Sequence, residues 1–254
     1  AWSSSEGGRA ERLRLEAGIM KGVLGVLGGM GPLATVDFMR KVIEVTPVTR
    51  DQDHLPMIVH SIPQVPDRTA AILRGGETPL PMLGDGIAAL NRAGVDCIAI
   101  PCNTAHYWFE EMERGSKAPI LHIVDAAAGA LDRRGFHGAT VGFLGTTGTI
   151  ASEIYQSRLE ARGYTCLVPE PGVQDDRVMA GITEVKAGRL DDAKRILEDA
   201  ATGLRARGVA TIVLGCTEIP VVLDDDALYL DATKALAEAC VTWFVERGRL
   251  ARAS

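Results

Sequence analysis

The sequence predicts an α/β protein with two pseudo-symmetric domains, each a parallel sheet flanked by helices, and one cleft between them. Short apolar runs alternate with amphipathic stretches of helical spacing, which is typical of β-α-β units. The chain also contains an internal duplication, because 25–32 (GVLGGMGP) resembles 142–149 (GFLGTTGT). Each turn is followed by an apolar run that ends in a cysteine, 77 positions (102 − 25) and 74 positions (216 − 142) after its start. These matched elements indicate two equivalent halves.

In the first half, strands are expected where short apolar runs are bounded by glycine or proline. These runs are 23–27, 57–62, 95–100 and 120–124. Apolar residues at helical spacing, ended by proline or glycine, predict the helices between them. The helical segments are 34–45, 80–93 and 107–114. The segment 63–74 is rich in turn residues and is expected to be irregular.

The second half repeats this alternation. Its strands are expected at 140–144, 165–168, 211–214 and 228–230, and its helices at 150–162, 175–187, 190–207 and 232–247. The closing helix is expected to pack back on the first half. The predicted domains are therefore 20–125 plus about 232–254, and 126–231. Residues 1–19 are given no role, because Met20-Lys21-Gly22 directly before the first strand looks like a native start.

Composition excludes several classes of function. A net charge of −6 without a Lys/Arg cluster argues against a nucleic-acid partner. No apolar stretch approaches the ~18 residues that a membrane span needs. The cysteine count of five is odd and residues 1–18 lack the apolar core of a signal peptide, so a reducing cytoplasm is expected rather than a disulfide-forming compartment.

Cys102 and Cys216 occupy equivalent positions of the duplication, each eight residues after a glycine, Gly94 or Gly208. The carboxyl ends of parallel strands meet at one edge of a sheet, where ligands bind. Backbone N–H groups there are expected to lower the cysteine pKa values toward the ~3.5–7.5 range of reactive thiols. Either cysteine alone could be a small residue in a tight bend. As a pair, they could take a proton from one side of a carbon and return one to the other, which inverts a stereocentre.

Other uses of the cysteines and glycines are less well supported. Cys97, Cys166 and Cys240 are expected to be buried structural thiols. Cys97, Cys102 and His106 lack the second ligand pair of a zinc site, so no metal is expected. The turn 28–31 (GGMG) lacks the G-x-G-x-x-G spacing of dinucleotide-binding proteins, and it is either a nest for a carboxylate or a tightly packed turn.

The spacing of four polar residues predicts no functional role for them, and a solvated surface position is expected for each. They are Arg50, Gln64, Arg68 and Lys186. No lysine lies in a context typical of pyridoxal phosphate binding.

Seven short motifs occur in a fixed order along almost the whole of 21–245. They are GGMGPLAT (28–35), TRDQDH (49–54), PQVPDR (63–68), PCNTAH (101–106), TTGT (146–149), VKAG (185–188) and GCTE (215–218). With these motifs the chain resembles the cofactor-independent aspartate/glutamate racemases, and the aspartate branch more closely. The resemblance implies two similar α/β domains with the active site in the cleft between them, a homodimer and no cofactor.

The resemblance also implies roles for individual residues. Cys102 and Cys216 would be the acid/base pair, with Cys216 acting on the L substrate and Cys102 on the D substrate. The other implied substrate-binding residues are Asn103, Thr104 and Thr217 for the α-carboxylate and α-amino group, Met30 and Thr147 along the pocket, and Arg50 and Lys186 for the side-chain carboxylate.

Two departures from the glutamate branch favour aspartate as substrate, with glutamate as the second candidate. The chain has Gly29-Met30 where that branch has Asp-Ser, and Glu218 where it has histidine. The alternatives are a racemase of broader or glutamate specificity, a hydantoin racemase, a maleate isomerase, a decarboxylase, or a protein that binds an acidic amino acid without turnover.

Overall fold

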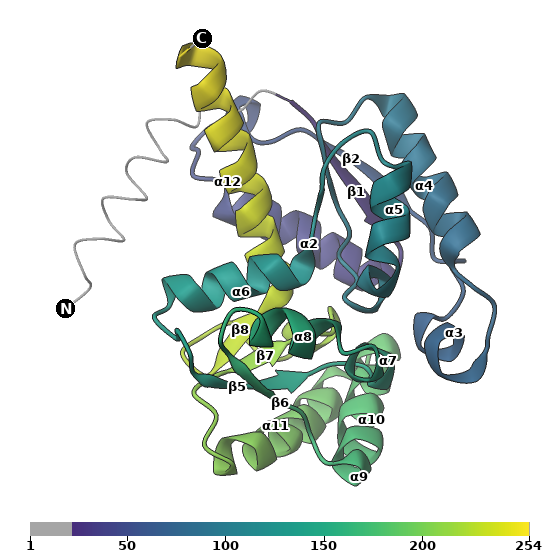
Figure 1. Ribbon diagram of the computed structural model, residues 1–254, viewed down its shortest axis with the longest axis vertical. Helices are drawn as coiled ribbons and strands as arrows, with labels where there is room; N and C mark the ends of the chain where they lie inside the picture. Colours follow the sequence, from purple (N-terminus) through teal and green to yellow (C-terminus); the bar gives the residue numbers. More distant parts are fainter. Residues whose placement is uncertain (1–21, 254) are drawn as a thin grey trace.

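The computed structural model describes residues 22–253, which fold into two four-stranded sheets with helices around them (Figure 1). The first sheet has the order β2-β1-β3-β4 and the second β6-β5-β7-β8, with every strand parallel to its neighbour. The strands are β1 (Leu24–Gly28), β2 (Met57–Ser61), β3 (Cys97–Ala99), β4 (Ile120–Leu121), β5 (Thr140–Leu144), β6 (Thr165–Leu167), β7 (Ile212–Leu214) and β8 (Tyr229–Asp231). The two sheets share one strand order, and the predicted α/β class and duplication are confirmed.

Helices cover the sheets because the central strands are apolar on both faces. All five residues of β1 are buried, as parallel strands with helices on both sides require. The helices before the second sheet are α2 (Pro32–Val45), α3 (Arg68–Arg74), α4 (Leu80–Ala93), α5 (Phe109–Gly115) and α6 (Ile123–Arg133). Those that follow are α7 (Thr147–Ala151), α8 (Ile154–Glu160), α9 (Pro171–Val173), α10 (Ala180–Lys186), α11 (Leu190–Ala206) and α12 (Ala232–Ala253).

Four short helical turns complete the part of the chain that the structure describes: η2 (Asp51–Asp53), η3 (Thr104–Trp108), η4 (Gln174–Met179) and η5 (Ile219–Val221). The turns η3 and η5 lie at equivalent places, just beyond the strands that carry the two cysteines. Gly94 and Gly208 precede those strands with φ of 71° and 79°. A residue with a Cβ atom would be strained there, which explains why a glycine stands at this place in each half.

The structure differs from the sequence prediction in the first half at two places. The segment 63–74 was expected to be irregular but contains α3, which Asp67 caps by accepting a hydrogen bond from the N–H of Ala70 (2.6 Å). The strand expected at 120–124 ends at Leu121, and α6 begins at Ile123. There the side chain of His122 accepts a hydrogen bond from the N–H of Val124 and caps the helix.

The helix expected at 150–162 is also different, because two short helices take its place. Glu153 lies between α7 and α8 with φ of 55°, a left-handed backbone that interrupts regular α-helix. The helix expected at 175–187 begins earlier, at Pro171, and passes through the π-helical turn η4 before α10.

The two halves share a hydrophobic core. One cluster of buried side chains includes Leu24 of β1, Val141 of β5, Tyr155 of α8 and Leu236 of α12. Helix α12 lies against α2 and α6, so the end of the chain returns to the first half as expected (Figure 1). The proposed division into 20–125 with 232–254 and 126–231 stays a prediction, and residues 1–19 lie outside the described residues.

A buried ion pair also joins the halves. Lys41 of α2 donates to Asp231 at the end of β8 (2.5 Å), and the two side chains are 6% and 2% exposed. Lys41 also pairs with Asp37, one turn earlier on α2. None of the helices within residues 22–253 is both long and apolar enough to cross a membrane.

Candidate active site

A pocket lies at the carboxyl ends of β3 and β7, between the two sheets. About 340 Å³ of space not filled by protein atoms, including the solvent at its mouth, lies within it. Both halves of the chain contribute to its wall. The lining residues are Met30, Asp67, Arg68, Thr69, Cys102, Asn103, Thr104, Thr146, Lys186, Cys216, Thr217 and Glu218.

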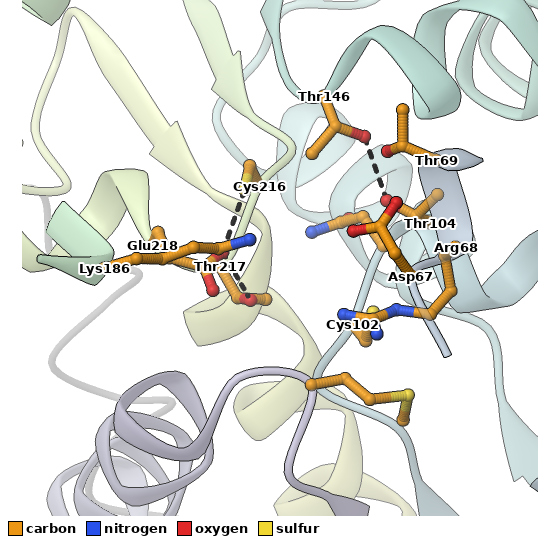
Figure 2. A pocket seen from close by; sticks show the side chains of 12 residues that line it. Asp67, Arg68, Thr69, Cys102, Thr104, Thr146, Lys186, Cys216, Thr217 and Glu218 are labelled. Carbon is orange, nitrogen blue, oxygen red and sulfur yellow. Dashed lines mark hydrogen bonds between the residues drawn. The ribbon is translucent and has the colours of Figure 1, made fainter. Parts of the chain in front are cut away.

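The structure brings Cys102 and Cys216 to this one pocket from opposite halves. Each cysteine is 5% exposed, and each follows its strand by only two or three residues. Figure 2 shows Cys216, Thr217, Glu218 and Lys186 on one side of the pocket, and Cys102 and Arg68 on the other. The predicted convergence of the duplicated strand ends is therefore observed.

The environment of Cys216 is different from the one expected. Its Sγ donates a hydrogen bond to Oε2 of Glu218 (2.9 Å). Burial, followed by the negative charge and hydrogen bond of Glu218, raises the pKa of the Cys216 thiol well above its ordinary value. The backbone and the positive charge of Lys186 act in the opposite direction and do not offset this. The expectation of a lowered pKa is wrong for Cys216, which is a protonated thiol here.

The backbone at Cys102 is anchored by a hydrogen bond from the side chain of His106. Its carbonyl oxygen accepts a hydrogen bond from Nδ1 of His106 (2.9 Å), and Nε2 of the same ring accepts one from the N–H of Ile123 (3.3 Å). Burial lowers the pKa of His106 to about 4, so the ring is neutral with its proton on Nδ1. His106 thus links the Cys102 turn to the start of α6.

A cluster of threonine hydroxyl groups joins the two halves beside the pocket. The side-chain oxygens of Thr104, Thr146 and Thr149 are bonded to one another at 2.8–3.0 Å. Thr104 belongs to the first half and the other two to the second. Helix α3 also reaches across, because a Cβ atom on Gly148 of α7 would lie only 2.8 Å from Oγ1 of Thr69. The two halves are in van der Waals contact at the rim.

Two cations reach the pocket: Arg68, for which a solvated surface position was expected, and Lys186, to which the resemblance gave a substrate-binding role. Arg68 is half-buried and donates from Nη1 to the carbonyl oxygens of Val65 and Pro66 (3.1 and 3.0 Å). Within residues 22–253 its buried Nε has no hydrogen-bond partner. Lys186, at the end of α10, is an exposed residue that also lines the pocket. The wall of the pocket therefore carries both cationic groups and the carboxylates of Asp67 and Glu218.

Seven of the nine residues proposed from the sequence line this pocket: Met30, Cys102, Asn103, Thr104, Lys186, Cys216 and Thr217. Arg50 and Thr147 do not. The side chain of Arg50 is 70% exposed and paired with Asp53 (2.7 Å). Thr147 lines a neighbouring cavity, and Thr146 of the same motif lines the pocket in its place.

Sequence reasoning did not assign a substrate-binding role to Asp67, Arg68 and Thr69. They form the start of α3, which was expected to be a loop. The aspartate after two prolines was the available signal, because it is a preferred helix N-cap residue. Cys97 and Cys240 are buried as expected, whereas Cys166 is only half-buried. No group of three or more His, Cys, Asp or Glu side chains in the described part of the chain is arranged to hold a metal ion.

The sequence and the fold of the chain also match those of known proteins. Residues 27–240 match the Asp/Glu/Hydantoin racemase family, which is most of the chain. The chain belongs to that family. It is therefore a racemase, an enzyme of the isomerase class.

Individual relatives agree with this assignment. The broad specificity amino-acid racemase RacX of Bacillus subtilis is 28% identical over 230 residues, which cover 88% of this chain and 98% of the relative. The structure of Picrophilus torridus aspartate racemase superposes with a TM-score of 0.80 at 33% identity, over 91% of this chain and 99% of that one. The glutamate racemase of Francisella tularensis shares the fold, with a TM-score of 0.64 at 16% identity over 90% and 82%.

Proposed function

We propose that this racemase interconverts L- and D-aspartate by a two-base mechanism, without pyridoxal phosphate. One cysteine removes the α-proton, and the other delivers a proton to the opposite face of the same carbon. The observation that carries the proposal is that Cys102 and Cys216, from equivalent strand ends, line a single small pocket. Met30, Asn103, Thr104, Lys186 and Thr217 are proposed as substrate-binding residues of that pocket.

The protonation state of Cys216 supports one starting arrangement. Glu218 and burial keep the proton on Cys216, so this thiol acts as the acid when Cys102 acts as the base. With Cys102 removing the α-proton of the D enantiomer, Cys216 completes the conversion to the L enantiomer. The reverse reaction starts with the proton on Cys102. The two cysteines thus exchange the roles of acid and base between the two directions of the reaction.

Removal of an α-proton builds negative charge on the α-carboxylate, and the pocket must supply hydrogen-bond donors at that place. Asn103, Thr104, Thr146 and Thr217 bring amide and hydroxyl groups to the pocket wall. Because these donors are fixed before the reaction, they stabilise the charge with little reorganisation.

An acidic substrate is supported by the two cations of the pocket. Arg68 and Lys186 can pair with a second carboxylate, while Asp67 and Glu218 offer negative charge to an ammonium group. The substrate-binding roles that the resemblance gives to Arg50 and Thr147 stay predictions. Because Arg50 lies away from this pocket and Arg68 lines it, the contacts of the pocket support Arg68 rather than Arg50 as the partner of the carboxylate. The similarity to an aspartate racemase at 33% identity agrees with aspartate as substrate.

A broader specificity is the second candidate. The observation that favours it is the similarity to the broad specificity racemase RacX, which extends over 98% of that protein. Glutamate, one methylene longer than aspartate, is the closest competing substrate.

Assembly and location remain proposals as well. An exposed apolar face of α2, with Leu33 52%, Val36 61% and Ile43 49% exposed, supports the predicted homodimer. The cytoplasm stays the predicted location.

The test is to incubate the pure protein, dialysed free of pyridoxal phosphate, with L-aspartate, L-glutamate or L-alanine and to separate the enantiomers by chiral chromatography. We expect L-aspartate to approach an equal mixture fastest. Similar rates on all three substrates would favour the broad-specificity candidate. Calorimetric binding of aspartate without any D-aspartate formation would contradict the proposed reaction.

A further inference from the structure

The side-chain amide of Asn103 is held by a residue from the other half of the molecule. Asn103 follows Cys102 in the first half, and Tyr155 lies on α8 in the second. The hydroxyl of Tyr155 donates a hydrogen bond to Oδ1 of Asn103 at 2.6 Å, and the two residues are 0% and 2% exposed. This contact is buried and joins elements 52 positions apart in the chain.

This hydrogen bond fixes the orientation of the Asn103 amide. An asparagine amide has an oxygen that accepts and a nitrogen that donates. Burial raises the pKa of Tyr155 well above its ordinary value, so its phenol keeps the proton and is a donor. A donor at that place selects Oδ1 as its partner and turns Nδ2 to the other side.

Nδ2 of Asn103 is left as an unused donor. It is buried and has no hydrogen-bond partner among the residues that the structure describes. Asn103 itself lines the pocket between the two cysteines, whereas Tyr155 is not one of the lining residues. Buried donors are almost always paired, so an unpaired donor at a pocket wall is a place for a ligand oxygen.

We propose that Tyr155 is a positioning residue, which fixes the Asn103 amide with its N–H group directed at the carboxylate of a bound amino acid. The inference rests on the racemase activity proposed above, and it adds a residue that acts only through Asn103. The hydrogen bond from Nδ2 of Asn103 to the substrate carboxylate becomes stronger as that carboxylate gains negative charge during α-proton removal. Its loss therefore reduces kcat more than it changes KM.

The packing of Tyr155 supports this role. Its ring lies against Phe143 of β5, with the ring centroids 4.3 Å apart. Phe143 is fully buried in the core shared by the two halves. The hydroxyl is thus fixed by the framework of the second half and holds a substrate-binding side chain of the first.

A double-mutant cycle tests the proposal. The racemisation of L-aspartate is measured for the wild type, Tyr155→Phe, Asn103→Ala and the double variant, with a thermal unfolding midpoint for each. We expect Tyr155→Phe to lower kcat by about 10- to 100-fold, below the ~10²–10³ of a fully deleted donor. In the Asn103→Ala background, Tyr155→Phe should cause no further loss, because its partner is already gone.

Tyr164→Phe is the matched control. Tyr164 is 3% exposed and donates to Asp132 at the same 2.6 Å, but it lies outside the pocket. Its kcat should stay within about twofold of the wild type, since its partner is not part of the proposed chemistry.

Unchanged kcat in Tyr155→Phe, or equal losses from this substitution with and without Asn103, would overturn the inference. If Tyr155→Phe does not fold, Asn103→Asp replaces it, because this carboxylate keeps the bond from Tyr155 but cannot donate to the substrate. Wild-type activity in folded Asn103→Asp would also overturn the inference. A wild type without racemisation would instead remove the proposed function, so the two failures are distinguishable.

Discussion

At the scale of single residues, Cys216 and Glu218 determine the protonation state of the site. The carboxylate of Glu218 accepts a hydrogen bond from the Cys216 thiol, with Sγ and Oε2 2.9 Å apart, and its charge opposes formation of the thiolate. Burial and the adjacent negative charge both disfavour the Cys216 thiolate, so the proton stays on Sγ. A glutamate at this position thus favours Cys216 as a proton donor.

Glu218→Gln should lower the pKa of the Cys216 thiol, because it removes the negative charge and the charged acceptor. The limb of the pH–rate profile that reports Cys216 ionisation should then move to lower pH. The measurement is kcat/KM for L-aspartate against pH, together with thiolate absorbance in the Cys102→Ala background. A limb that stays in place or moves to higher pH would contradict this electrostatic role.

Arg68 and Arg50 give opposite expectations, because only Arg68 lines the pocket. Arg68→Ala should raise KM for aspartate by about 10- to 100-fold, as expected for the loss of a hydrogen bond to a charged group. Arg50→Ala is the matched variant, and its exposed ion pair with Asp53 predicts a change of about twofold or less. If Arg50→Ala has the larger effect, the role given to Arg50 by the family resemblance is correct.

The sequence located the two cysteines because a duplication marks both of them with the same spacing. It gave no signal for Tyr155, whose role depends on a contact across the two halves. Tyr155 reaches Asn103 over 52 positions, and no local pattern predicts such a contact. Arg68 was missed for a related reason, since a cation near a turn is normally solvated.

At the scale of elements, the strands were predictable from short apolar runs, whereas the short helices were not. Helix α3 has only seven residues and depends on the Asp67 cap and on Gly75, with φ of 61°, at its end. Helix α6 follows a two-residue strand so closely that its first apolar residues extended the strand in the prediction. The start of α3 carries three residues of the pocket wall, so the error concealed part of the site.

The ion pair between α2 and β8 gives a prediction for stability. Lys41→Ala leaves the buried carboxylate of Asp231 without its cation, whereas Asp37 keeps its pair with Arg40. Such a loss should reduce the free energy of unfolding by about 3–5 kcal/mol. Arg40→Ala is the control, because Arg40 is 53% exposed in its pairs with Asp37 and Glu44 and should change stability by less than about 1 kcal/mol. Urea unfolding of both variants measures the difference, and equal effects would show that the buried pair has no special role.

At the scale of the whole molecule, the duplicated halves are joined by a common core and meet again at the pocket. Helix α12 packs on α2 and α6, and the hydroxyls of Thr104, Thr146 and Thr149 connect the halves at the other end. A pocket built from two equivalent strand ends can present one thiol from each side. This arrangement follows from the duplicated fold, and it allows the proposed reaction to run in either direction with the two cysteines exchanging roles.

The central claim is that two different cysteines act on opposite faces of one carbon, and racemisation in heavy water tests it most directly. L-aspartate with ordinary hydrogen at the α-carbon is converted briefly, and both enantiomers are separated and examined by mass spectrometry. A donor thiol equilibrated with the solvent delivers deuterium, so newly formed D-aspartate should carry deuterium while the remaining L-aspartate keeps its hydrogen. D-aspartate that retains the original hydrogen would show that a single base moves the proton across, and would contradict the two-cysteine account.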